Sequence, residues 1–303
     1  MSRYYVLSID GGGIRGVLAA ALLERLEEAH PGFLARFDLF AGTSTGGILS
    51  LGLASGIQPT LARHLYEDLG SHVFADSAYD NIRDLGTLIG ADYSVGPLKE
   101  TLAAQFGDLT LGDLPKRVLI SSFDLDNGCA DPALRSWKAK FFHNFPGPGS
   151  DCSESVVDVA IRTSAAPTYF PIYQGYVDGG VVAGNPGMCA LAQALHAPTG
   201  GQSLHDVVLL SLGTGHNPRF LSAQDGDWGL VQWAPHLVNL MLEGSSRLVD
   251  YQCRQILDER YLRLNPLLPW PIPMDGVKHI GALKRVARQA DLTQAHRWID
   301  RFF

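Results

Sequence analysis

The chain has 303 residues, of which 24 are Lys or Arg and 31 are Asp or Glu, so its formal net charge at neutral pH is −7. Hydrophobic residues make up 46% and charged residues 18%, which excludes a largely disordered chain because such chains are poor in apolar residues. The acidic balance also argues against a protein that binds a nucleic-acid duplex, which needs a basic surface for the phosphates. Glycine is in excess, with 33 residues, and no regular period spaces them, so we expect many of them in particular turns.

The pattern of apolar residues predicts strands that alternate with helices along the chain. Strands are expected over residues 4–9, 37–41, 118–123, 176–177 and 207–212, and helices over 17–29, 48–54, 60–69 and 232–257. Residues 144–150 and 267–274 contain several prolines and are expected to be loops, the first on the surface and the second rigid and apolar. The alternation predicts an α/β protein, a three-layer sandwich in which helices cover both faces of a central, mostly parallel sheet. The turns that follow the strands then converge on one edge of the sheet.

Cysteine usage and the N-terminal residues predict a cytoplasmic protein. Cys129, Cys152, Cys189 and Cys253 are widely spread, and neither their spacing nor that of the histidines fits a zinc site. We therefore expect mostly buried thiols, no disulfide and no metal. The first ten residues lack the pattern of a signal peptide, and no run of about 18 apolar residues predicts a transmembrane helix.

Residues 42–46, with the sequence Gly-Thr-Ser-Thr-Gly, fit the pattern Gly-x-Ser-x-Gly between a strand and an apolar helix. This pattern is typical of a nucleophilic serine on a sharp, strained turn, where the small neighbours Gly42 and Gly46 leave room for the backbone. The turn also places the hydroxyl at the positive end of a helix dipole, which favours developing negative charge. We therefore expect Ser44 to be a nucleophile, with a helix N-cap as the alternative.

Residues 11–16 fit the pattern Gly-x-Gly-x-x-Gly, again after a strand and before a helix. One interpretation is a dinucleotide-binding loop, which needs an acidic residue at the end of the second strand; Asp38 is near that distance but opens the strand. The other is an oxyanion hole, since consecutive glycines allow several backbone N–H groups to point at one atom. The presence of Ser44 at the end of the second strand favours the oxyanion hole.

A serine nucleophile needs a base, and the sequence offers ten histidines. None has a setting that marks it as catalytic, although His216, directly after Gly213-Thr214-Gly215, stays open as a candidate. Asp178 is the better candidate because it follows a short strand and precedes two glycines, Gly179 and Gly180, that expose its carboxylate. On spacing alone, Asp-Gly-Gly is also a common turn.

Four ordered motifs resemble those of the patatin-like phospholipases. They are Asp-Gly-Gly-Gly-Ile-Arg-Gly at 10–16, Gly-Thr-Ser-Thr-Gly-Gly at 42–47, Thr-Ser-Ala-Ala-Pro-Thr-Tyr-Phe-Pro at 163–171 and Asp-Gly-Gly at 178–180; residues 137–144 are similar to a further family segment. The resemblance covers about residues 4–215 and implies one patatin-like catalytic domain over residues 1–303, which helices and loops over 216–303 complete. The chain departs from the pattern at Gly184, where the family often has asparagine.

The resemblance implies a Ser–Asp dyad and an acyl-serine intermediate. Ser44 is the nucleophile, Asp178 takes its proton without a histidine, and Gly11, Gly12 and Gly13 supply oxyanion donors. The supporting residues are Asp10, Arg15, Gly16, Gly42, Gly46, Gly179 and Gly180, with Arg15 expected to order the glycine loop rather than to bind phosphate. The implied activity is that of a lipid acyl hydrolase of phospholipase A type, a carboxylic ester hydrolase with no cofactor, whose substrate is a phospholipid or a related acyl-ester lipid.

The substrate groove is less well defined by the sequence. Apolar candidates for its wall are residues 48–53 together with Trp228, Trp233, Leu237, Leu240, Met241 and Trp270, although most of residues 232–257 are expected to face the core. Trp270, or a basic patch of Arg135, Lys138 and Lys140, would allow peripheral contact with a membrane. Two further function classes stay open, a nucleotide-binding oxidoreductase that uses the glycine loop and a ligand-activated, non-catalytic effector, since some bacterial relatives of the family are activated by cyclic oligonucleotides.

Overall fold

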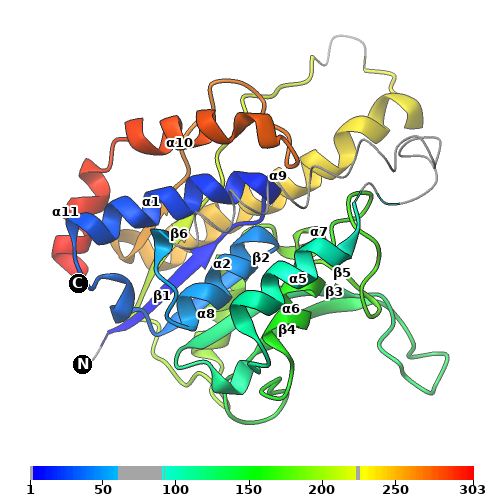
Figure 1. The fold of residues 1–303 in the computed structure, drawn as a ribbon, viewed down its shortest axis with the longest axis horizontal. Helices are drawn as coiled ribbons and strands as arrows, with labels where there is room; N and C mark the ends of the chain where they lie inside the picture. The colour runs from blue at the N-terminus through cyan, green and yellow to red at the C-terminus, as the bar shows by residue number, and fades with distance from the viewer. Residues whose placement is uncertain (1–2, 61–90, 92, 223–225) are drawn as a thin grey trace.

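A mixed, mostly parallel sheet forms the centre of the protein (Figure 1). The structure is a computed structural model that describes residues 3–60, 91, 93–222 and 226–303. The strands are β1 (Tyr4–Ile9), β2 (Leu39–Thr43), β3 (Arg117–Asp124), β4 (Lys138–His143), β5 (Tyr176–Asp178), β6 (Val207–Leu212) and β7 (Tyr261–Leu264). Their order is β4-β3-β2-β1-β6-β7, with β5 also paired to β3. The β1–β2, β1–β6, β2–β3 and β6–β7 pairs are parallel, whereas β4 and β5 run antiparallel to β3.

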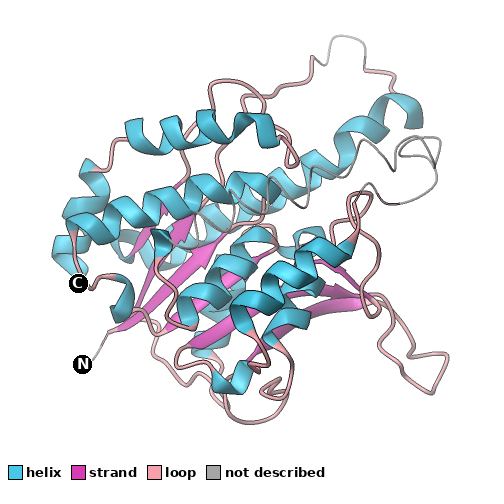
Figure 2. Cartoon of the chain, in the orientation of Figure 1, coloured by secondary structure: helices cyan, strands magenta, loops and turns pink. Residues whose placement is uncertain are grey.

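Helices cover both faces of the sheet, which confirms the predicted three-layer α/β architecture (Figure 2). They are α1 (Gly16–Ala29), α2 (Thr45–Ala54), α5 (Val95–Phe106), α6 (Val156–Ser164), α7 (Gly180–Ala183), α8 (Gly187–Leu195), α9 (Leu230–Leu257), α10 (Ile280–Gln289) and α11 (Thr293–Phe302). Alternate strand residues enter two separate cores because successive side chains of a strand point to opposite faces. Leu7 and Ile9 of β1 pack into the core formed with α1, α2, α5, α6, α10 and α11, and Val6 packs into the core formed with α8 and α9.

Several predicted elements are confirmed, and others begin at a different residue. The strands at 4–9 and 207–212 have the predicted bounds, and α1 begins one residue before the prediction. The prediction that a strand begins at Phe37 was wrong: Phe37 packs against the ring of Phe33, Asp38 accepts the N–H of Tyr5 with its carboxylate, and β2 begins at Leu39. Helix α2 begins at Thr45 rather than at 48, and the helix expected over 60–69 lies, except for its first residue, outside the described residues.

The loop predictions also need adjustment. Residues 144–150 contain no helix or strand, but Asn144 and Phe145 are buried, so only the rest is a surface loop. The Asn144 side chain bonds the backbone of Val118, Leu111 and Lys116, which explains its burial. Residues 267–274 are a loop, as predicted.

The four thiols are free, as expected, but the expectation that most of them are buried was wrong. Only Cys253 is buried, Cys129 and Cys189 are partly buried, and Cys152 is exposed. Within the described ranges, no helix is both long and apolar enough to cross a membrane.

Strands β2 and β5 lie end to end along the same edge of β3. Thr43, the last residue of β2, is paired with Ser121, and Asp178, the last residue of β5, is paired with the next residue, Ser122. The other edge of β3 is occupied by β4 over residues 119–124. Because β5 runs antiparallel to β3 while β2 runs parallel to it, the carboxyl ends of β2 and β5 face each other. This topology brings Ser44, directly after β2, close to Asp178.

Candidate active site

Ser44 occupies a strained turn between β2 and α2. Its φ of 55° and ψ of −125° are rare for a residue with a side chain, and such conformations gather at functional sites. The backbone N–H of Ser44 donates to Thr163 Oγ1 at 2.9 Å, which helps to fix the turn. A Cβ on Gly42 would lie 2.1 Å from the carbonyl oxygen of Gly46, and a Cβ on Gly46 would lie 2.2 Å from that of Ile9. The two flanking glycines are therefore required by close backbone approaches.

Asp178 lies opposite Ser44 and is almost completely buried, with 5% of its surface exposed. Burial raises the pKa of its carboxyl group to about 6, while hydrogen bonds from the Ser44 hydroxyl and the Gly180 N–H lower the pKa in part. The Gly180 N–H donates to Asp178 Oδ1 at 2.7 Å. A Cβ on Gly179 would lie 2.3 Å from Ser121 Oγ, so this glycine lets the carboxylate segment pack against β3.

The glycine loop that follows β1 is held by contacts with distant parts of the chain. The N–H of Gly11 donates to the carbonyl oxygen of Gly184 at 3.0 Å, so this amide is occupied. A Cβ on Gly12 would collide with Thr214, and Gly13 has a φ of 58° and lies against the carbonyl of Met274. A Cβ on Gly16 would likewise lie 2.1 Å from Thr45 Oγ1. Among the described residues, the amides of Gly12 and Gly13 donate to no backbone carbonyl, which leaves them as the candidate oxyanion donors of this loop.

A buried ion pair fixes the start of the same loop. Asp10 and Arg263 each expose 7% of their side chains, and Arg263 Nη1 donates to Asp10 Oδ1 at 2.8 Å. Arg263 also donates to Ser211 Oγ at 2.7 Å, and Ser246 Oγ of α9 donates to Asp10 Oδ2 at 3.0 Å. The nearby Asp10 carboxylate raises the pKa of Arg263 despite its burial. Asp10 is therefore anchored by groups from β6, α9 and β7.

Arg15 contacts two backbone carbonyl groups at the glycine loop and its surroundings. Its Nε donates to the carbonyl oxygen of Gly12 at 3.3 Å, and its Nη1 makes a longer contact of 3.5 Å with that of Gly215. Burial lowers the pKa of Arg15, and the nearby Glu243 raises it.

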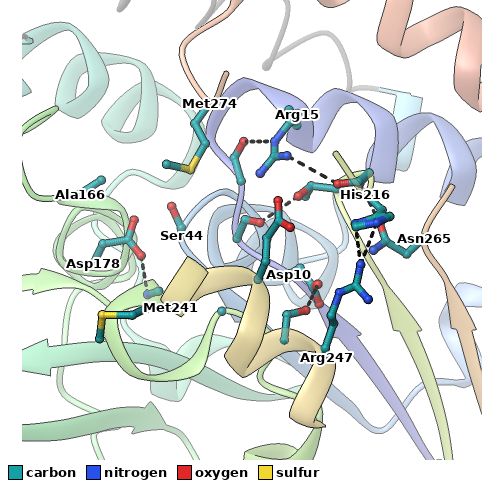
Figure 3. A pocket seen from close by; sticks show the side chains of 18 of the residues that line it. Asp10, Arg15, Ser44, Ala166, Asp178, His216, Met241, Arg247, Asn265 and Met274 are labelled. Carbon is teal, nitrogen blue, oxygen red and sulfur yellow. Dashed lines mark hydrogen bonds between the residues drawn. The ribbon is translucent and has the colours of Figure 1, made fainter. Parts of the chain in front are cut away.

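One cavity of about 570 Å³ is lined by Ser44, by Asp178 and by most of the residues around the glycine loop, although not by Gly13 (Figure 3). Ser44 and Asp178 lie toward an end where Ala166, Met241 and Met274 supply apolar surface. The opposite end is polar and is lined by Asp10, Arg15, His216, Arg247 and Asn265. The cavity thus offers an apolar wall beside the serine and a charged wall beyond the glycine loop.

Most of the apolar residues predicted for the groove lie elsewhere. Met241 lines the cavity. Leu49, Leu51 and Leu53 are buried in the core with α2, so the expectation that residues 48–53 line the groove was wrong. Trp233, Leu237, Leu240 and Trp270 are partly exposed, between 38% and 47%, and do not line the cavity, and neither does Trp228.

Three other predicted features have partners that limit their roles. His216 lines the cavity, and Arg247 Nη2 donates to its Nε2 at 2.8 Å. In the expected basic patch, Arg135 pairs with Asp126 and Lys140 pairs with Asp151, so the charges of these two groups are compensated. Asp38 bonds Tyr5 and does not line the cavity, so it is not placed to bind a nucleotide ribose there.

A family model described as patatin-like phospholipase matches residues 7–190. The chain belongs to the patatin-like phospholipase family. A "cGAMP-activated phospholipase" of Pseudomonas aeruginosa is 32% identical, over 97% of this chain and 86% of that relative. "Protein teg" of Priestia megaterium is 30% identical over 99% of both chains, and "Patatin group M-1" of Solanum tuberosum is 29% identical over 86% of this chain and 74% of its own. Among solved structures, VipD from Legionella pneumophila aligns over 100% of this chain and 67% of that chain, with 12% identity and a TM-score of 0.42.

The family motifs lie in the matched region, but several groups that hold them in place do not. No sequence pattern points to Arg263, Ser246 or Met274, which contact Asp10 or the glycine loop from beyond residue 190. A buried aspartate such as Asp10 requires a cationic partner. The sequence contains 24 Lys and Arg residues and no pattern that singles out Arg263.

Proposed function

We propose that the protein is a lipid acyl hydrolase of phospholipase A type that cleaves fatty-acyl esters through a Ser44–Asp178 dyad. The observation that supports this most is the pairing of a strained Ser44 with a buried carboxylate whose pKa is raised to about 6, inside a cavity with an apolar wall. Membership of the patatin-like phospholipase family agrees with an ester lipid as substrate.

The proposed reaction has two steps. In the first, Asp178 accepts the hydroxyl proton of Ser44 while Ser44 Oγ attacks the ester carbonyl, and the N–H groups of Gly12 and Gly13 stabilise the negative oxygen that forms. Collapse of the intermediate breaks the bond to the alcohol, which leaves with the proton from Asp178. In the second step, Asp178 takes a proton from water, the resulting hydroxide attacks acyl-Ser44, and the fatty acid is released as Ser44 regains its proton.

The raised pKa of Asp178 suits this role. An ordinary carboxylate is a weak base for an alcohol, and a base works best when its pKa lies near the working pH. Only the ionised form of Asp178 can accept the proton, so kcat/KM is expected to rise with pH through about 6 and then to level off. A profile that is flat between pH 5 and pH 8 would contradict the assignment.

The direct test measures fatty acid released from phospholipid micelles by the wild type, Ser44→Ala and Asp178→Asn. Both variants should stay folded and lose at least about a thousandfold in rate, and Ser44→Ala should no longer react with a fluorophosphonate probe. Ser50→Ala and Asp124→Asn are matched controls, because both residues are buried near the site but do not line the cavity.

The assay is run with and without cGAMP, because the Pseudomonas aeruginosa relative is described as cGAMP-activated. An active Ser44→Ala protein overturns the dyad. A wild type that binds lipid, is not labelled by the probe and releases no fatty acid under either condition instead supports a non-catalytic effector.

A further inference from the structure

Three side chains from separate elements gather around the dipeptide 215–216 at the polar end of the cavity (Figure 3). Arg15 comes from the turn after β1 and contacts the carbonyl oxygen of Gly215. Asn265, which directly follows β7, accepts the N–H of Gly215 with Oδ1 at 2.9 Å. Arg247 of α9 reaches the ring of His216. The cluster is therefore assembled by the same edge of the sheet that carries Ser44.

The charges at this end do not balance. Arg263 pairs with Asp10, and Arg254 pairs with Asp250. Within the part of the chain that the structure describes, Arg15 and Arg247 form no ion pair with a carboxylate, although both line the cavity. Two acidic residues of the cavity wall remain: Asp178 lies at the serine end, and Glu243 lies close enough to Arg15 to raise its pKa. At the polar end, two arginines without an ion pair therefore face one carboxylate. In a chain with a net charge of −7, this leaves one local positive charge beside the glycine loop.

The hydrogen-bonding groups at this end are mostly donors. An arginine can only donate, so Nε2 of His216 is an acceptor that Arg247 already occupies. The bond from Gly215 fixes the oxygen of Asn265, so its amide NH₂ is the group left to donate. Guanidinium groups with neighbouring N–H donors are suited to an anion with several acceptor oxygens, above all phosphate.

We propose that this end of the cavity binds the phosphodiester of a phospholipid headgroup, and that Arg247 determines the preference for phospholipid over neutral ester lipid. The proposal rests on the proposed function. The acyl chain lies along the apolar wall of Met241, Met274 and Ala166, the ester is at Ser44, and the phosphate lies beyond the glycine loop. A phosphodiester carries one negative charge, which matches the one uncompensated positive charge.

Of the two arginines without an ion pair, Arg247 is the better one to substitute. Arg15 also holds the glycine loop, so its removal would disturb the proposed oxyanion donors. Arg247 is exposed on α9, and within the described residues its side chain bonds only the ring of His216. Arg247→Gln keeps a polar side chain, and Arg247→Lys keeps the charge but loses the planar group.

The experiment compares phosphatidylglycerol with a diacylglycerol of the same acyl chains, in the same uncharged detergent micelles. For Arg247→Gln, the ratio of kcat/KM for phosphatidylglycerol to kcat/KM for diacylglycerol should fall roughly tenfold to a hundredfold, the loss expected when a hydrogen bond to a charged group is removed. Arg247→Lys should recover part of the ratio. Arg288→Gln, which changes an exposed arginine on α10, should leave both substrates unaffected.

The outcomes separate the two proposals. Fluorophosphonate labelling and diacylglycerol hydrolysis report the dyad, so a wild type that shows neither contradicts the proposed function itself. An active enzyme whose substrate ratio is unchanged in Arg247→Gln overturns the headgroup site. A third arm adds inorganic phosphate or cGAMP: if Arg247→Gln alters the response to these solutes while the lipid ratio stays constant, the site serves a soluble phosphate and the lipid assignment is wrong.

Discussion

The two parts of the chain build the site by different means. In the region that matches the family model, Ser44 and Asp178 are held by close backbone approaches at glycines, such as Gly42, Gly46 and Gly179, where no side chain fits. In the C-terminal region, support for the glycine loop comes largely from side chains that reach in from α9 and β7. Backbone approaches tolerate one residue type and therefore leave a recognisable motif, whereas side-chain support can be supplied from many positions. Substitutions at the glycines should therefore prevent folding, whereas substitutions of the supporting side chains should lower stability and rate by smaller amounts.

The largest effect is expected for Gly46→Ala. Its Cβ would lie 2.2 Å from the carbonyl oxygen of Ile9 and 2.6 Å from that of Asp10, and neither backbone atom can move without breaking the sheet edge. We expect little folded protein, measured by soluble yield and circular dichroism. Gly52→Ala is the matched control in the same helix, because its Cβ would meet Ile57 Cδ1 at an ordinary 3.5 Å and should stabilise α2 by up to about 1 kcal/mol. Normal folding of Gly46→Ala would show that the backbone contact is not strict.

Arg263→Gln tests the C-terminal support. It leaves the Asp10 carboxylate buried without its cation, which typically costs about 3–5 kcal/mol, and should also lower kcat by displacing the glycine loop. Urea denaturation and ester hydrolysis measure the two effects. Arg260→Gln is the control, since Arg260 bonds the carbonyls of Leu204 and Val207 at the opposite end of the sheet. Adding Asp10→Asn to Arg263→Gln should recover part of the stability, and a double variant no more stable than the single one argues against the pair.

Asp178→Asn, unlike Arg263→Gln, should make the folded protein more stable. The pKa of Asp178 is raised from 3.8 to about 6 in the folded protein. The contribution of this carboxyl group to the free energy of unfolding is therefore complete below about pH 4 and is lost as the pH rises through 6. Removing the ionisable group should therefore stabilise the protein at pH 8 by about 3 kcal/mol, and by about half as much at pH 5. Chemical denaturation at the two pH values measures the difference. A stability gain that is equal at the two pH values would show that the ionisation of Asp178 is not its cause.

The smallest effect is expected for Ser246→Ala. The variant removes one hydrogen bond to the Asp10 carboxylate but leaves the bonds from Arg263 in place, so a loss of about 1.5 kcal/mol in the free energy of unfolding is expected. The rate should fall severalfold, because Asp10 directly precedes the loop. Gln255→Ala, at an exposed position of the same helix, should change neither measurement. If Ser246→Ala matches the wild type in both measurements, α9 does not anchor the loop.

Elements were predicted best from the sequence where several consecutive residues must all be buried. The continuous apolar runs of β1 and β6 predicted their bounds, because both strands are buried on both faces. Sequence prediction failed at the start of α2, where Gly46 and Gly47 do not favour a helix but are the residues that fit against β1 and Thr163. It also failed to find β7, whose four residues show no clear period. Arg263 and Arg247 could not be found because their roles depend on contacts between distant parts of the chain.

The shared edge of β3 has a consequence for how the chain can be altered. Thr43 and Asp178 are paired with the adjacent residues Ser121 and Ser122, so the distance between the serine and the carboxylate follows from one step along a strand. This serine-to-carboxylate distance does not depend on the length of the chain that connects β3 to β5. The exposed stretch between β3 and β4, which includes Leu134 and Trp137 at 64% and 71% exposure, can therefore accept an inserted reporter domain without shifting the dyad. A split enzyme cut at the same place would bring its two halves into alignment through β3 itself.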